Sequence, residues 1–178
     1  MHFQNGSIYW TPNTGAYAIP GDMFKAWGAK GYETGTLKYP AAEATKVGEG
    51  YVQKFQGGYL TRNPDGKNFM VYGAIGEKYG QMGGATSNLG FPKGNEIAIR
   101  GGFFQEFEKG NIYWSPATGA HVIYYGDIFN EWGKRGYEQG SLGWPTSDMK
   151  QIPAGGLTID FQKGRLDQIN GVVIERKR

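Results

Sequence analysis

The chain has 178 residues, of which 39% are apolar and 15% aromatic, with 31 glycines, no cysteine and a formal charge of +3. The lack of cysteine excludes disulfides and thiolate metal sites, and a charge so near neutrality gives no concentrated basic face, so we expect no nucleic-acid partner. No apolar run reaches the ~20 residues that a membrane-spanning helix needs, so we expect no membrane span.

The sequence repeats itself about every 52 residues, which is a period typical of stacked repeat units. A Leu-x-x-Pro motif stands at residues 37–40, 89–92 and 142–145. Other landmarks keep the same step, namely Phe3, Phe55, Phe107 and Phe161, and Gly6, Gly58, Gly110 and Gly164. Several landmarks at one fixed period predict tandem repeats that bury a shared core by stacking.

The first repeat opens at Phe3 and reads as a strand at residues 8–10, a turn at 11–15 and a helix at 22–30. The second repeat keeps turn chemistry at residues 63–67, where Pro and Gly favour a chain reversal. Its helix carries Ile75, Tyr79 and Met82 at spacings that place them on one face.

The third repeat is the clearest, because residues 103–108 alternate apolar and polar side chains as a strand does. Two further strands at 112–114 and 120–123 complete a predicted three-stranded meander. A helix at 127–135 and a loop at 140–148 follow, with Gly136 as the left-handed stop and Leu142 and Trp144 pointing inward. The last stretch, residues 157–178, repeats only the strands.

These elements predict an α+β protein built from antiparallel meanders, each followed by one helix and one Leu-Gly-x-Pro loop. We expect a single repeat domain over residues 1–178, with units at about 1–50, 51–101 and 102–155 and a partial unit at 156–178. A compact pseudo-symmetric ring, or propeller-like arrangement, and an open stacked array both fit the pattern.

The motifs resemble the LGFP tandem-repeat family of actinobacterial envelope proteins, most closely over residues 110–148 and 73–92. The resemblance implies repeats that are appended to mycoloyltransferases, amidases and other exported proteins, and that attach them to arabinogalactan or peptidoglycan. It therefore implies a secreted, envelope-associated module that binds cell-wall polysaccharide, with a neighbouring catalytic domain in a longer parent protein. We find no export signal ahead of the first repeat landmark, so either the chain is cytosolic or its signal lies upstream. The glutamate that often follows Thr-Ser-Asp in the family is Met149 here, and the first repeat reads Pro40-Ala41-Ala42-Glu43.

The residues do not predict an enzyme, a cofactor or a metal site. Of the two histidines, His2 is terminal and His121 stands where the other repeats have Tyr17 and Phe69, so we expect it on the repeat surface. Asp22 and Asp127 occupy equivalent helix starts, where a carboxylate caps or complements the helix end. A protein-interaction or structural scaffold for a catalytic neighbour is the second reading, and a small wall hydrolase with a carboxylate pair is the third.

Two aromatic pairs beside turns, Tyr9-Trp10 and Tyr113-Trp114, are the predicted glycan contacts, because flat rings stack on the C–H faces of sugars. Neighbouring strand residues face opposite sides, so we expect one ring of each pair outward, and we favour the tyrosine or the adjoining turn. The alternative that both rings serve packing between repeats stays open. The loop residues Thr146, Ser147 and Asp148 complete the candidate site, whereas Trp27, Tyr79 and Trp132 are predicted core.

Overall fold

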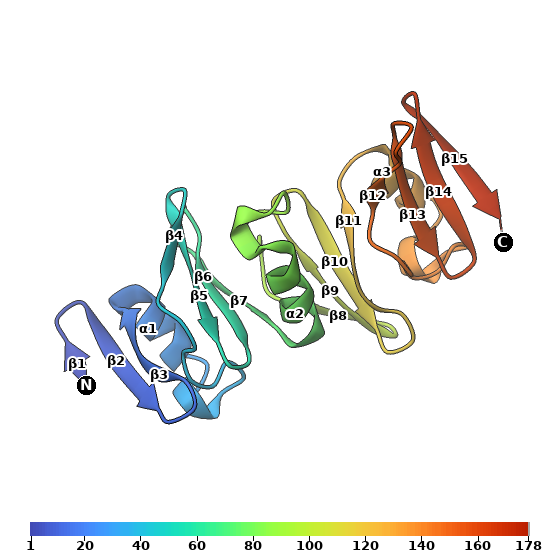
Figure 1. Cartoon of the computed structure of the whole chain (residues 1–178). Helices are drawn as coiled ribbons and strands as arrows, with labels where there is room; N and C mark the ends of the chain where they lie inside the picture. The colour runs from blue at the N-terminus through green and yellow to red at the C-terminus, as the bar shows by residue number, and fades with distance from the viewer. Residues whose placement is uncertain (178) are drawn as a thin grey trace. The chain divides into compact units, whose positions relative to one another are not determined.

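The computed structural model describes residues 1–177, and these form an α+β fold of four antiparallel sheets, three α-helices and three 3-10 helices (Figure 1). The chain divides into two compact units, Met1–Glu96 and Ile97–Arg178. The compact ring and the open stacked array both stay predictions. Within the units we call residues 2–44, 45–96 and 97–149 modules 1, 2 and 3, and residues 150–177 the C-terminal sheet.

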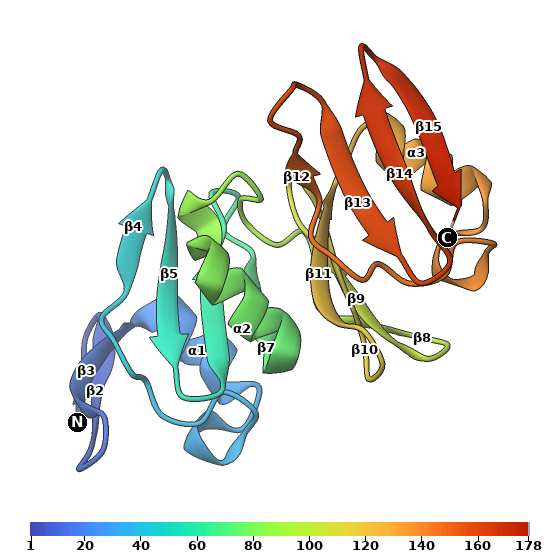
Figure 2. The same ribbon diagram turned by 45° about the vertical axis from the view of Figure 1, so that its right-hand side comes forward.

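The unit Met1–Glu96 contains modules 1 and 2. Module 1 consists of β1 (His2–Phe3), β2 (Gly6–Thr11), β3 (Gly15–Pro20), α1 (Gly21–Gly28) and the 3-10 helix η1 (Tyr32–Thr34). Module 2 consists of β4 (Thr45–Val47), β5 (Gly50–Phe55), β6 (Gly58–Arg62), β7 (Asn68–Tyr72), α2 (Gly73–Met82) and η2 (Gly84–Thr86). The strands of each sheet follow one another in chain order, and α2 lies against the sheet β4–β7 (Figure 2).

The unit Ile97–Arg178 contains module 3 and the C-terminal sheet. Module 3 consists of β8 (Ile97–Ile99), β9 (Gly102–Glu106), β10 (Gly110–Ser115), β11 (Gly119–Tyr124), α3 (Asp127–Lys134) and η3 (Tyr137–Gln139). The C-terminal sheet consists of β12 (Lys150–Gln151), β13 (Leu157–Phe161), β14 (Gly164–Ile169) and β15 (Val172–Lys177). These residues confirm the meander, helix and loop order that the repeat pattern predicts.

The predicted three-stranded meander is correct for module 1 and wrong for the other three sheets, which each gain a short leading strand. β4, β8 and β12 have three residues or fewer, which is too short for an alternating pattern to be visible. β4 pairs with β5 through a tight hairpin in which Gly48 has a φ of +56°. The left-handed backbone there suits glycine, which has no side chain to clash.

The helices end as predicted, and the aspartates at their starts lie inside the first turn rather than at the N-cap. Gly136 has a φ of +92°, in the left-handed region that closes a helix. Within the described chain, the N-cap residues Pro20 and Gly126 make no side-chain capping bond, but the Asp22 carboxylate accepts from Met23 N–H at 2.9 Å. Asp22 and Asp127 both lie in the first helical turn, where a negative charge is still favourable. Asp22 forms an ion pair with Arg62, and Asp127 accepts a hydrogen bond from Gln168 at 3.0 Å.

Each compact unit buries the helix of one module against the sheet that follows it. In Met1–Glu96 the Trp27 ring of α1 lies 5.5 Å from the Phe55 ring of β5, and both side chains are fully buried. In Ile97–Arg178 the same contact joins Trp132 and Phe161 at 5.3 Å. The predicted core positions are confirmed, and burial of these aromatic surfaces from water stabilises the pairing of helix and sheet.

The Leu-Gly-x-Pro loop is fixed to its own helix by one repeated hydrogen bond. The indole N–H of Trp27 donates to the Lys38 carbonyl at 3.0 Å, and that of Trp132 donates to the Gly143 carbonyl at 3.2 Å. In module 2 the Tyr79 hydroxyl donates to the equivalent Gly90 carbonyl at 2.8 Å. The exchange of tryptophan for tyrosine therefore preserves the donor that a buried loop carbonyl requires.

The first sheet differs from the others because its apolar face is exposed. Phe3 is 56% exposed and Ile8 is 38% exposed, whereas the equivalent Phe55 and Leu60 are buried. A hollow of about 640 Å³ follows this face, lined among others by Phe3, Ile8 and Ile19.

The C-terminal sheet carries a charged cluster where modules 1 and 3 have a tyrosine. Asp167 is 4% exposed and lies on the strand face opposite Leu166. Its carboxylate accepts a hydrogen bond from Thr158 at 2.6 Å and pairs with Arg165 at 3.2 Å and Arg176 at 3.3 Å. Burial pushes the Asp167 pKa upward, but the bonds from Thr158 and Arg176 and the two arginine charges outweigh it, so the net pKa is lowered.

We expect Asp167→Asn to destabilise the protein by about 1–3 kcal/mol at pH 7, because the arginines and Thr158 lose a charged acceptor. A lowered folded pKa means that the wild-type contribution is fully present above the unfolded pKa of about 3.9. That contribution is lost as the pH falls through the lower folded value. Urea denaturation at pH 7 and at pH 3 should therefore show a larger acid loss for wild type than for the variant. The exposed Glu49→Gln substitution is the control, and equal acid losses in wild type and D167N would contradict the assignment.

Candidate functional site

The predicted aromatic pairs lie on β2 and β10, and in both pairs the tyrosine faces the helix. The Tyr113 ring contacts Trp132 edge-on at 4.8 Å and stacks on Phe104 at 5.1 Å, and its side chain is 5% exposed. The Tyr9 ring contacts Trp27 in the same way at 4.7 Å. Burial raises the pKa of Tyr113 well above its usual value, against a weaker opposing effect of the Asn111 side chain. The expectation that the tyrosines face outward is wrong, because the helix tryptophans need these rings as packing partners.

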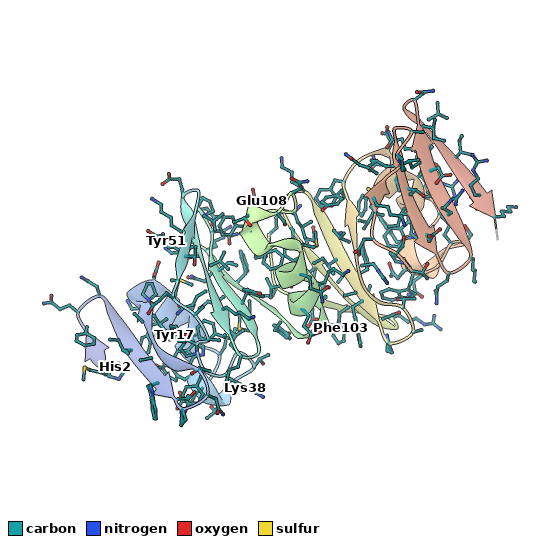
Figure 3. All side chains as sticks on the ribbon, viewed as in Figure 1. His2, Tyr17, Lys38, Tyr51, Phe103 and Glu108 are labelled. Atoms are coloured by element: carbon teal, nitrogen blue, oxygen red, sulfur yellow. The ribbon has the colours of Figure 1, made fainter. Side chains whose placement is uncertain are left out.

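The tryptophans occupy the opposite strand face. Trp10 is 64% exposed and lies across from Ala16, whose small side chain leaves the indole uncovered. Trp114 lies across from Ala120 on one side and Phe103 on the other, 5.8 Å from the Phe103 ring. Phe103 projects from β9 and is itself 36% exposed (Figure 3). Sequence reasoning missed Phe103, although the alternation of residues 103–108 places it on one face of its strand.

The turns beside the tryptophans hold themselves in shape. The hydroxyls of Thr11 and Thr14 lie 2.6 Å apart, and Thr14 N–H donates to the Thr11 hydroxyl at 3.0 Å. The corresponding turn of module 3 joins Ser115 and Thr118 at 2.6 Å. Each turn therefore presents its neighbouring tryptophan from a fixed backbone, with its own hydroxyls already bonded to each other.

The loop residues Thr146, Ser147 and Asp148 connect the sheet of module 3 to the C-terminal sheet. An Asp148 carboxylate oxygen accepts from Val122 N–H at 3.0 Å, and the Ser147 hydroxyl accepts from Asp160 N–H at 2.9 Å. Thr146 N–H donates to the Asp160 carbonyl at 2.8 Å, while its buried hydroxyl has no hydrogen-bond partner within residues 1–177. The side chains of Ser147 and Asp148 therefore hold the loop in place, whereas Thr146 contributes a backbone bond.

The acidic residue of this loop has the same role in module 1. Glu43 stands at the position equivalent to Asp148, and its carboxylate accepts from Ala18 N–H at 3.3 Å. Ala18 is the counterpart of Val122 in the strand that precedes the helix. Aspartate or glutamate at this position therefore joins the loop to the strand that precedes its own helix.

His121 meets a carboxylate, but the pair lacks the geometry of a nucleophilic site. Its Nδ1 lies 3.4 Å from the Asp148 carboxylate, and its Nε2 lies 2.6 Å from the Thr118 carbonyl. A histidine that activates a nucleophile presents one nitrogen to a hydroxyl or thiol. Here that nitrogen faces a backbone carbonyl, so the contact joins β11 to the turn and the loop.

Within residues 1–177, no group of three or more histidine or acidic side chains lies in an arrangement that could hold a metal ion. No helix of the described residues combines the length and the apolar character needed to cross a membrane.

The predicted residues fall in both compact units. Tyr9 and Trp10 belong to Met1–Glu96, whereas Tyr113, Trp114 and the loop 146–148 belong to Ile97–Arg178.

Comparison with curated proteins gave no match. Comparison with protein families matched the LGFP repeat at residues 1–35, 37–87 and 89–140. These three matches cover most of the sequence and each contains one of the helices α1, α2 and α3, and the chain therefore belongs to the LGFP repeat family.

Proposed function

We propose that this chain is a non-catalytic module that anchors a protein to an envelope polysaccharide, either arabinogalactan or peptidoglycan. The observation that carries the proposal is the exposure of Trp10, a large flat ring held beside a rigid turn. Such a ring loses little conformational freedom on binding and can stack on the C–H face of a sugar. Trp114 with Phe103 offers a second aromatic surface of the same kind in module 3.

Weak contacts at separate modules would reinforce one another on a polymer. Once one module has bound, the next module meets the same chain at a high effective concentration. Each contact can then be weak, with a Kd on the order of millimolar, while the whole chain is retained. The proposal includes a secreted, wall-associated location and a catalytic domain in a longer parent protein as the anchored cargo.

We expect Trp10→Ala to lower retention on purified cell wall about two- to tenfold, because contacts of a flat aromatic ring are worth about 0.5–1.5 kcal/mol. Sedimentation of the full chain with wall fractions, stripped stepwise of lipid, arabinogalactan and peptidoglycan, measures this retention and identifies the polymer. Ile8→Ala is the matched control, because Ile8 is an exposed apolar residue on the same strand face without a flat ring. Equal retention of wild type and W10A on every fraction would contradict the role of Trp10.

A protein-interaction scaffold is the second candidate function, and the exposed face of β1 and β2 favours it. Phe3 and Ile8 border a hollow of about 640 Å³ that is largely apolar. Exposed apolar surface of this kind is typical of sites that another protein covers. Analytical ultracentrifugation measures whether the chain associates with itself. A molecular mass that rises with concentration in the wild type, but stays at the monomer value in Phe3→Ser, would favour the scaffold over the anchor.

A further inference from the structure

Module 2 departs from modules 1 and 3 at the aromatic cluster around its central helix residue. Besides Phe55 and Phe161 of the following sheets, three rings of module 1 surround Trp27 at 4.7 to 6.2 Å, and three rings of module 3 surround Trp132 at 4.8 to 6.4 Å. The surrounding residues are Tyr9, Phe24 and Tyr32 in module 1 and Tyr113, Phe129 and Tyr137 in module 3. Module 2 has Thr61, Gly76 and Gly84 at the equivalent positions around Tyr79.

The backbone of module 2 has kept the shape that these rings occupy elsewhere. Gly84 has a φ of +59°, while Tyr32 and Tyr137 hold φ values of +53° and +55° at the equivalent positions. A tyrosine in the left-handed region is rare, so its appearance twice shows that this conformation belongs to the repeat. Module 2 therefore lacks these rings but keeps the backbone conformation of the repeat.

A tyrosine from another strand position takes part of the vacated space. Tyr59 of β6 contacts the Tyr79 ring edge-on at 6.0 Å. A Cβ atom added at Gly80 would lie 2.3 Å from the Tyr59 hydroxyl, just as one at Gly28 would meet the Tyr32 ring at 2.6 Å. The helix glycine thus allows a tyrosine to lie directly on the helix in each case, and in module 2 this tyrosine comes from β6.

Two hollows remain on the two sides of Tyr59. One has about 680 Å³ and runs along the β5–β6 hairpin and α2, and the other has about 290 Å³ and reaches the loop after η1 and the η2 turn. Both are lined by Lys54, Tyr59 and Gly80, so the tyrosine is their shared wall. The larger volume lies within the range of 300–1,000 Å³ that small-ligand sites commonly have.

The lining has the chemistry of a sugar site. Tyr59 is a partly exposed ring, and Gln56, Glu77 and Gln81 supply hydrogen-bonding groups. One lysine, Lys54, and one glutamate, Glu77, border the larger hollow, so its charges balance. Glu43 borders the smaller hollow, where its carboxylate accepts from Ala18 N–H. Balanced charge with several donors and acceptors suits a neutral polyhydroxyl chain better than an acidic or a cationic ligand.

We propose that the two hollows beside Tyr59 form one groove of module 2. This groove is the principal glycan site of the chain, and it takes a short segment of neutral polysaccharide. The inference rests on the proposed wall-binding function and deepens it, because it places the main contact at Tyr59 and favours a neutral arabinan or galactan chain over the charged peptide-bearing peptidoglycan. Trp10 and Trp114 then contribute secondary contacts.

Chemical-shift mapping of the full chain against neutral arabinogalactan fragments and against soluble peptidoglycan fragments tests the site. We expect the neutral fragments to shift amides of residues 54–59 and 73–86, and the peptidoglycan fragments to shift them at least fivefold less at equal concentration. Shifts confined to the turns beside Trp10 and Trp114 would overturn the groove while leaving wall binding intact. No shifts anywhere, together with no retention on any wall fraction, would remove the proposed function itself.

Gly84→Tyr restores the ring that modules 1 and 3 carry and should fill the smaller hollow on an already suitable backbone. We expect at least a tenfold loss of affinity for the neutral fragments. Thermal unfolding checks that the variant is folded, because the new ring and Tyr59 compete for the surface of Gly80. Asn88→Tyr is the matched control, because it adds the same ring to an exposed position of the following loop. Should G84Y unfold, the exposed pair Glu77→Gln and Gln81→Ala replaces it, with a threefold or greater loss expected. Wild-type affinity in a folded G84Y, or in the E77Q/Q81A double variant, would overturn the proposal.

Discussion

Phe55→Ala should lower the free energy of unfolding by about 3–5 kcal/mol, whereas Phe3→Ala should change it by less than about 0.5 kcal/mol. The two phenylalanines hold equivalent repeat positions, yet Phe55 is fully buried and Phe3 is 56% exposed. Removal of the Phe55 ring leaves a cavity beside Trp27. The Phe55 backbone also forms a β-bridge with Pro40, so the cavity lies where the loop meets β5. Removal of the Phe3 ring opens no cavity, because that ring already faces solvent.

Guanidinium denaturation of the two variants, monitored by tryptophan fluorescence and by circular dichroism, measures the difference. The comparison holds residue type and repeat position constant, so it isolates the effect of burial. A loss of more than 2 kcal/mol in F3A would show that another surface covers Phe3 in solution, and the scaffold reading would then gain over the anchor.

Gly102→Ala should cost about 3 kcal/mol, which is at the upper end of what overpacking usually costs. A Cβ atom at this position would lie 2.0 Å from the Trp114 carbonyl oxygen and 2.8 Å from the Trp144 ring. The same restriction holds at the equivalent Gly50, where a Cβ atom would meet the Phe91 ring at 2.5 Å. In modules 2 and 3, the lack of a side chain at this glycine therefore leaves room for the aromatic residue of the Leu-Gly-x-Pro loop.

Gly94→Ala is the control for this prediction, because a Cβ atom there would meet no atom within 4 Å. We expect it to be neutral or slightly stabilising, since alanine restricts the unfolded chain more than glycine does. Thermal unfolding of both variants is the measurement, and equal midpoints for G102A and G94A would show that the Trp144 loop can shift without cost.

The sequence by itself determined the repeat, the order of its elements and most of its core. Apolar residues at helical spacing, such as Trp27 and Trp132, lie on the inner helix face because no other face of an amphipathic helix can be removed from water. Turn glycines such as Gly136 were readable for a similar reason, since few residues other than glycine readily take the left-handed backbone.

The direction of the Tyr-Trp pairs could not be read from the sequence. Alternation shows that Tyr113 and Trp114 face opposite sides, but either ring could be the buried one. Packing of Tyr113 between Trp132 and Phe104 decides the matter, and those partners lie on a helix and a neighbouring strand. The short strands β4, β8 and β12 were missed because pairing with a longer strand, rather than their own pattern, holds them in place.

Buried polar groups depended most on the tertiary structure. Gln53 is fully buried and donates to the Ala18 and Ala42 carbonyls at 2.9 Å each. The hollows of module 2 likewise border Gly76 and Gly84, which stand where modules 1 and 3 carry rings. Sequence determines local periodicity and turn chemistry because these act between near neighbours. The partners of a buried amide, and the space left by a missing ring, exist only once distant segments have packed together.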